Sequence, residues 1–129
     1  MNGKTLLDTN AVIAVFAKDA AVLAIVSDAT ECFLPSIVLG ELYYGAHHSA
    51  KVADNIARLE VFRDTVKLLP CDEETAAEYG RIKNELRTKG RPIPENDIWI
   101  AAIAAQHRLE LLSNDDHFDD VDGISRKSW

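Results

Sequence analysis

Four acidic residues occur where the predicted strands and helices of this chain meet its loops: Asp8, Glu41, Asp97 and Asp115. Glu41 has no basic neighbour three or four positions away, and the inner side of Asp97 is equally apolar. Carboxylates that converge without basic partners repel one another, and some of them stay protonated near neutral pH. A divalent cation removes this repulsion, and hard oxygen ligands select Mg²⁺ or Mn²⁺. The acids therefore predict a metal site.

Most of these acids also have a simpler structural interpretation. Asp97 could cap a helix or favour its dipole, and Asp8 could cap the helix that follows the first strand. Asp115 and Asp116 could form a turn. Glu41 is the exception, because an acid inside a helix among apolar neighbours has no capping role. The four residues together support the metal site better than any one of them does.

A buried helix followed by a buried strand is predicted to carry two of these acids. Every residue from Ile98 to Ala105 is apolar, which leaves no face of a helix for solvent. Pro94, Asn96 and Asp97 mark the start of this helix. The short apolar run 109–112 then predicts a buried parallel strand that ends shortly before Asp115.

The rest of the chain alternates in the same way and predicts one α/β domain over residues 1–129. Pro35 is expected to end the second strand, with Ser36 as the N-cap of the next helix, and Gly90 is expected to end the fifth helix. The predicted strands are 5–8, 32–35, 66–69, 109–112 and 124–129, and the predicted helices before the buried one are 9–18, 20–28, 37–47, 51–64 and 73–88. Such strands form a mainly parallel sheet in a three-layer α/β/α sandwich, and ligands bind beyond the carboxyl ends of its strands.

Composition narrows the function classes. The net charge of −7 argues against general binding of nucleic acid by counterion release. Positive charge is concentrated just before Asp97, and we expect it to guide a phosphate backbone to the site or else to form a solvated helix face. These candidate RNA contacts are Lys83, Arg87, Lys89 and Arg91. No apolar run has the length of a membrane span, no signal peptide is evident, and Cys32 and Cys71 are expected to be reduced thiols of a cytoplasmic protein.

Four segments resemble the PIN-domain ribonucleases, and in particular the VapC toxins of type II toxin–antitoxin modules. They are Leu-Leu-Asp8-Thr-Asn, Gly40-Glu41-Leu-Tyr-Tyr-Gly45, Pro94-Glu-Asn-Asp97-Ile-Trp and Leu-Leu-Ser113-Asn-Asp115-Asp-His-Phe118. The resemblance implies a five-stranded sheet of order 3-2-1-4-5, which would place the ends of the first and fourth strands side by side. It also implies that the four acids are the metal-binding and catalytic residues and that Thr9, Asn10 and Ser113 support them. Asp116 and Asp119 match the pattern less closely and are left outside the site.

The resemblance implies a Mg²⁺-dependent endoribonuclease, with Mn²⁺ as a substitute ion and without a nucleophilic side chain. His117 is interpreted as a surface histidine. VapC-like toxins form homodimers and are held inactive by a small antitoxin, and we expect both partners here. An apolar groove formed by Leu39, Leu42, Tyr43 and Ala46 is the predicted interface. The alternatives are a DNA or flap-type nuclease on the same scaffold, a phosphoacceptor signalling domain, and a non-catalytic binding module.

Overall fold

The computed structural model describes residues 3–129, so Met1 and Asn2 of the predicted domain lie outside the described residues. The strands are β1 (Lys4–Leu7), β2 (Glu31–Pro35), β3 (Lys67–Leu69), β4 (Glu110–Leu112) and β5 (Arg126–Lys127). The helices are α1 (Thr9–Phe16), α2 (Ala20–Asp28), α3 (Ser36–His47), α4 (Val52–Arg63), α5 (Glu73–Lys89) and α6 (Glu95–His107), and η1 (Asp116–Asp120) is a short 3₁₀ helix. Most boundaries lie within two residues of the predicted ones.

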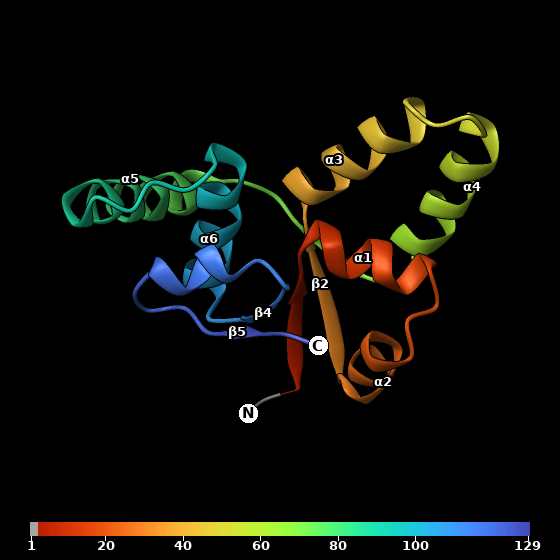
Figure 1. Cartoon of the computed structure of the whole chain (residues 1–129), viewed down its shortest axis with the longest axis horizontal. Helices are drawn as coiled ribbons and strands as arrows, with labels where there is room; N and C mark the ends of the chain where they lie inside the picture. The colour runs from red at the N-terminus through yellow and green to blue at the C-terminus, as the bar shows by residue number, and fades with distance from the viewer. Residues whose placement is uncertain (1–2) are drawn as a thin grey trace.

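The five strands form one sheet of order β3-β2-β1-β4-β5, and all four neighbouring pairs are parallel. The predicted sandwich and its strand order are confirmed. The central strand β1 pairs Leu6 with Phe33 of β2 on one side and with Leu111 of β4 on the other. The direction of the strand order reverses beside β1, so the carboxyl ends of β1 and β4 form the edge at which such folds bind ligands. Figure 1 shows α1 to α4 on one side of β1 and α5 and α6 on the other.

The core is built around α6 and the central strands. Ile100, Ala101, Ala102 and Ile103 are fully buried, as are both leucines at the end of β4. The alanines allow α6 to lie close to its neighbours, and each buried leucine or isoleucine contributes about 1.5–3 kcal/mol. The predicted buried helix is therefore confirmed. Its first turn, which contains Asp97, is therefore anchored to the buried core.

Of the two predicted helix caps, the one at the end of α5 is confirmed and the one at the start of α3 is not. Asp72 and Thr75 form a capping box at its start, and Gly90 ends it in the left-handed conformation with φ of +69°. The prediction that Ser36 caps α3 is wrong. Ser36 is already the first residue of the helix, because Pro35 is the cap residue and also pairs with Leu69 at the end of β2.

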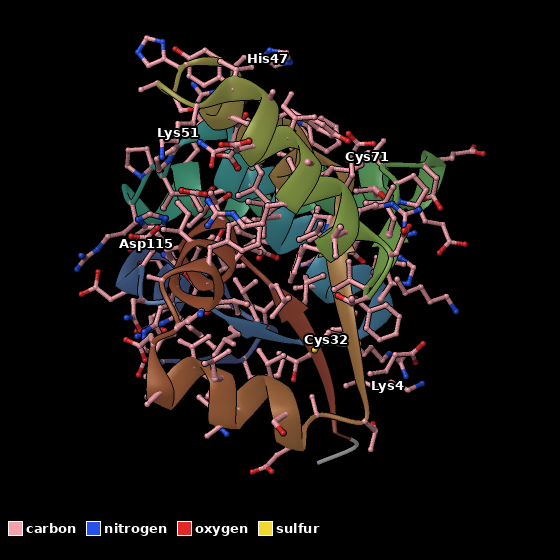
Figure 2. All side chains as sticks on the ribbon, turned by 90° about the vertical axis from the view of Figure 1, so that its right-hand side faces the viewer. Lys4, Cys32, His47, Lys51, Cys71 and Asp115 are labelled. Atoms are coloured by element: carbon pink, nitrogen blue, oxygen red, sulfur yellow. The ribbon has the colours of Figure 1, made fainter. Side chains whose placement is uncertain are left out.

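The two cysteines lie apart, and neither forms a disulfide. Cys32 is near the start of β2 and Cys71 follows the end of the parallel neighbour β3, and both carry free thiols (Figure 2). Within residues 3–129 no single helix is long and apolar enough to cross a membrane. α1 and α2 together have the length and composition, but they meet at 109° and both take part in the fold of this domain.

Candidate active site

Asp8 is the most buried of the four acids. It follows β1 directly, its residue is 3 % exposed, and its backbone N–H donates to the carbonyl of Leu112. The Ser113 hydroxyl donates to Asp8 Oδ2 at 2.6 Å, and the backbone N–H of Thr9 donates to Oδ1 at 2.8 Å. The second bond makes Asp8 the N-cap of α1, so the simpler interpretation of this residue is also correct. The cap uses Oδ1 and leaves Oδ2 to the bond from Ser113.

The end of β4 brings a second group of polar side chains to the same place. Ser113 is fully buried, and its hydroxyl accepts from the backbone N–H of Asp115 at 3.1 Å. Asn10 donates to Ser113 Oγ at 3.3 Å and to Asp115 Oδ2 at 3.4 Å. Asp8 and Asp115 are thus connected through one hydroxyl and one amide. Figure 2 shows Asp115 well away from Lys4, which begins β1.

Glu41 and Asp97 reach this site from two helices that contact each other, α3 and α6. The Thr9 hydroxyl donates to Glu41 Oε1 at 3.1 Å, and this contact is consistent with the predicted supporting role of Thr9. Asp97 is the third residue of α6 and its side chain is 16 % exposed. Pro94 occupies the N-cap position and no side chain caps this helix. Asp97 therefore has no capping bond to explain its position.

The pKa values of the acids are shifted mainly by burial, and the charges of neighbouring acids add to the shift. Burial raises the pKa of Asp8, although the bonds from Ser113 and Thr9 oppose the shift, and the charge of Asp115 adds to it. Burial also raises the pKa of Glu41, and Asp8 and Asp97 raise it further. The pKa of Asp97 is raised by burial and by the two other aspartates, against the lowering effect of the nearby His117. Repulsion among the acids is thus present without a cation.

His117 belongs to this site, and its interpretation as a surface histidine is wrong. Its side chain is 29 % exposed, and Nε2 lies 2.7 Å from Asp97 Oδ2. The η1 turn places it there, because Phe118 is buried and holds the turn against the core. One potential ligand atom from each of Asp97, Asp115 and His117 lies within 4.8 Å of the others. The donor set of carboxylates and one imidazole suits a divalent ion. The sequence does not predict this position of His117, because a histidine two residues after an acid does not indicate a 3₁₀ turn that faces the site.

The remaining acids of this loop are outside the cluster. Asp119 forms a bidentate ion pair with Arg126, in which Nε donates to Oδ1 at 2.9 Å and Nη2 donates to Oδ2 at 2.7 Å. Arg126 also donates to the backbone carbonyl of Ser113 at 3.2 Å, so it ties η1 to the end of β4. Asp116 is exposed.

Two of the four candidate RNA contacts are engaged in ion pairs. Lys83 contacts Glu95 at 2.8 Å, and Lys89 contacts Asp122 at 2.9 Å and donates to the carbonyl of Asp120. Arg87 and Arg91 are exposed, and no ion pair to either occurs among residues 3–129. Figure 1 shows α5 extending outward on the α6 side of the sheet.

The residues predicted to form an apolar groove on α3 do not form it by themselves. Leu42 and Ala46 are buried and Leu39 and Tyr43 are half-buried, because α4 folds back against α3. A cavity of about 260 Å³ nevertheless lies between α1, α3 and α4. It starts at Thr9 and Glu41 and is lined by Ile13, Phe16, Leu59 and Arg58. Ile13 is 55 % exposed, so the groove is apolar, open and continuous with the acids.

Comparison with known proteins gives a consistent result. The PIN domain family matches residues 5–124. Ribonuclease VapC2 of Haemophilus influenzae is 39 % identical over 131 residues, covering 98 % of both chains. The DNA-bound VapBC structure from Salmonella typhimurium contains a chain that superimposes with a TM-score of 0.91 at 30 % identity, covering 98 % of each chain. VapBC-5 from Mycobacterium tuberculosis, a member of the VapBC family of toxin–antitoxin systems, gives a TM-score of 0.75 at 30 % identity over 98 % of this chain and 97 % of that one.

These matches cover nearly the whole chain and include every segment from which the resemblance was inferred. They exclude a phosphoacceptor domain, which has a different arrangement of acids. The chain belongs to the PIN-domain family and, within it, to the VapC ribonucleases.

Proposed function

We propose that this protein is a divalent-metal-dependent endoribonuclease that acts as the toxin of a toxin–antitoxin pair. One observation carries the proposal: four acids from β1, α3, α6 and the end of β4 converge at the switch point of the sheet. In three of them, Asp8, Glu41 and Asp97, the pKa is raised. Burial is the main cause of these shifts and repulsion among the acids adds to it, and a cation-binding function explains why such acids are placed together.

The acids Asp8, Glu41, Asp97 and Asp115 are the proposed metal-binding and catalytic residues. When bound, Mg²⁺ or its substitute Mn²⁺ supplies Lewis-acid stabilisation of the phosphate and a more acidic water. Ser113 and Asn10 hold Asp8 and Asp115 in a common orientation, and Thr9 holds Glu41. The burial of Asp8 and Ser113 keeps these orientations rigid, which is what an oxygen-ligand site needs for its geometry.

The proposed RNA path runs along α5 and the connection to α6. Arg87 and Arg91 are its main cations, because both are exposed and unpaired within the described chain. Lys83 and Lys89 contribute less, since each already neutralises an acid. On a protein with a net charge of −7, a local basic path is required to bring a phosphate backbone to an acidic site.

The proposed partners are a small antitoxin and a second copy of this chain, in the cytoplasm. The groove between α1, α3 and α4 leads directly to Glu41, so a peptide lying in it could direct a basic side chain at the acids. Tyr44 and Val61, which are 71 % and 70 % exposed on α3 and α4, offer further apolar surface for association. A cell needs such restraint on a ribonuclease.

The proposal is tested by incubating the purified protein with labelled single-stranded RNA and with DNA of the same sequence. Cleavage of RNA should require Mg²⁺ or Mn²⁺, stop in excess chelator, and fall by at least about 1,000-fold in Asp8→Asn. Asp28→Asn is the matched control, because Asp28 is an exposed acid on α2. Full cleavage in chelator would refute the metal mechanism. Cleavage of DNA in preference to RNA would establish the DNA nuclease alternative.

A further inference from the structure

The Nε2 atom of His117 is buried although part of the ring is exposed, and it faces the acids. It lies 2.7 Å from Asp97 Oδ2, within ion-pair distance, and no other partner for Nε2 occurs among residues 3–129. Its neighbours are the groups that would share a cation with it, Asp97 and Asp115.

The geometry of these three residues fits a common ion. Ligands at about 2.1 Å from one ion lie about 3 Å apart when adjacent and about 4.2 Å apart when opposite. The potential ligand atoms of Asp97, Asp115 and His117 lie within 4.8 Å of one another, and His117 Nε2 lies 2.7 Å from Asp97 Oδ2. Small side-chain rotations would therefore complete the coordination. The turn that bears His117 is held by buried Phe118 and by the Arg126 ion pair to Asp119, so the imidazole is held at the site.

We propose that His117 is a metal ligand of this centre and that it makes the centre select Mn²⁺ or a similar first-row transition ion over Mg²⁺. This inference rests on the proposed metal-dependent function. Mg²⁺ strongly prefers oxygen ligands, whereas imidazole nitrogen binds transition ions well. A centre with carboxylates alone would discriminate weakly between Mg²⁺ and Mn²⁺, and one imidazole shifts the balance. The competing role for His117 is a plain ion pair that neutralises Asp97.

The two roles are separated by titrating wild type, His117→Gln and His107→Gln with Mn²⁺ and with Mg²⁺ by calorimetry. His107 is exposed at the end of α6 and serves as the matched control. A ligand role predicts that His117→Gln raises the Kd for Mn²⁺ by about tenfold or more while the Kd for Mg²⁺ changes by less than about threefold. An ion-pair role predicts equal changes for both ions or tighter Mg²⁺ binding, and either result overturns the proposal.

Pulsed electron paramagnetic resonance of the Mn²⁺-loaded protein gives an independent readout. Nitrogen hyperfine coupling should appear in wild type and in His107→Gln and be absent from His117→Gln. Its absence from wild type overturns the ligand role even if cleavage and Mg²⁺ binding are normal. Failure of the proposed metal-dependent function gives a different result, because Asp8→Asn would then bind both ions as tightly as wild type does. The Tm of each variant in chelator shows that it is folded.

Discussion

The buried hydroxyl of Ser113 offers the most direct test of how this site is held together. Ser113→Ala removes the donor to Asp8 Oδ2 while changing the volume of the side chain by one oxygen. The hydroxyl is fully buried, so no water can replace it without a rearrangement. Asp115 and Asn10, the other two partners, are less buried and can find solvent. The effect of the substitution should therefore come almost entirely from Asp8.

The magnitude follows from the type of bond that is lost. A hydrogen bond to a charged group contributes about 1.5–3 kcal/mol, so we expect Ser113→Ala to lower the free energy of unfolding by about 2 kcal/mol at pH 7. For a domain of this size that is a fall in Tm of about 8 °C. Ser125→Ala is the control, since Ser125 is exposed and its loss should change stability by less than about 0.5 kcal/mol.

The pH dependence identifies the bond as one to a carboxylate. Burial raises the pKa of Asp8 above its ordinary value of 3.8, so the native protein takes up this proton at a higher pH than the unfolded chain does. Without the Ser113 bond, which lowers this pKa, the pKa of the variant is higher still. The difference between the two proteins should therefore shrink toward about 1 kcal/mol as pH falls and Asp8 becomes protonated, and widen as pH rises.

Denaturant unfolding in chelator between pH 4 and pH 8 measures this difference. The chelator keeps added metal from masking the effect. A difference below about 0.5 kcal/mol at pH 7, or one that does not change with pH, would refute the view that Ser113 stabilises an ionised Asp8.

Other properties of the site and its surfaces can be tested in the same protein. In chelator, Asp8, Glu41 and Asp97 should contribute less to the stability of wild type as pH rises from about 4, because acids with a raised native pKa bind protons more tightly when folded. Divalent ions should reverse this contribution in thermal melts of wild type compared with Glu41→Gln. Glu41→Gln should abolish cleavage yet leave the Tm in chelator equal or higher, and a Tm several degrees lower would contradict the repulsion. Replacing both Arg87 and Arg91 by Glu should weaken RNA binding at least about tenfold and flatten its salt dependence, with turnover of saturating RNA unchanged; an unaltered salt slope would exclude the basic path. Ile13→Asp should weaken antitoxin binding by at least about tenfold in a pull-down or titration while cleavage persists, since Ile13 is exposed in the groove.

The sequence alone determined the class of this protein, because the relevant signals are local. The apolar run 98–105 predicts a buried helix, and short apolar runs that alternate with helices predict parallel strands. Strand order came from the resemblance, and it placed the ends of β1 and β4 together as the structure has them. The acids at these ends were predictable for that reason. Glu41, which is half-buried, was predictable as a candidate because no basic residue lies within one helical turn of it.

Contacts between distant side chains were decided only by the tertiary structure. Ser113 meets Asp8 across 105 residues because β1 and β4 pair in one register, and a shift of that register would separate them. The ion pairs of Lys83 and Lys89 depend on how α5 lies against α6 and the last loop, which helical periodicity does not encode. His117 is the clearest case. A 3₁₀ turn fixed by one buried phenylalanine rotates it toward Asp97, and neither the turn nor that contact has a repeating pattern in the sequence.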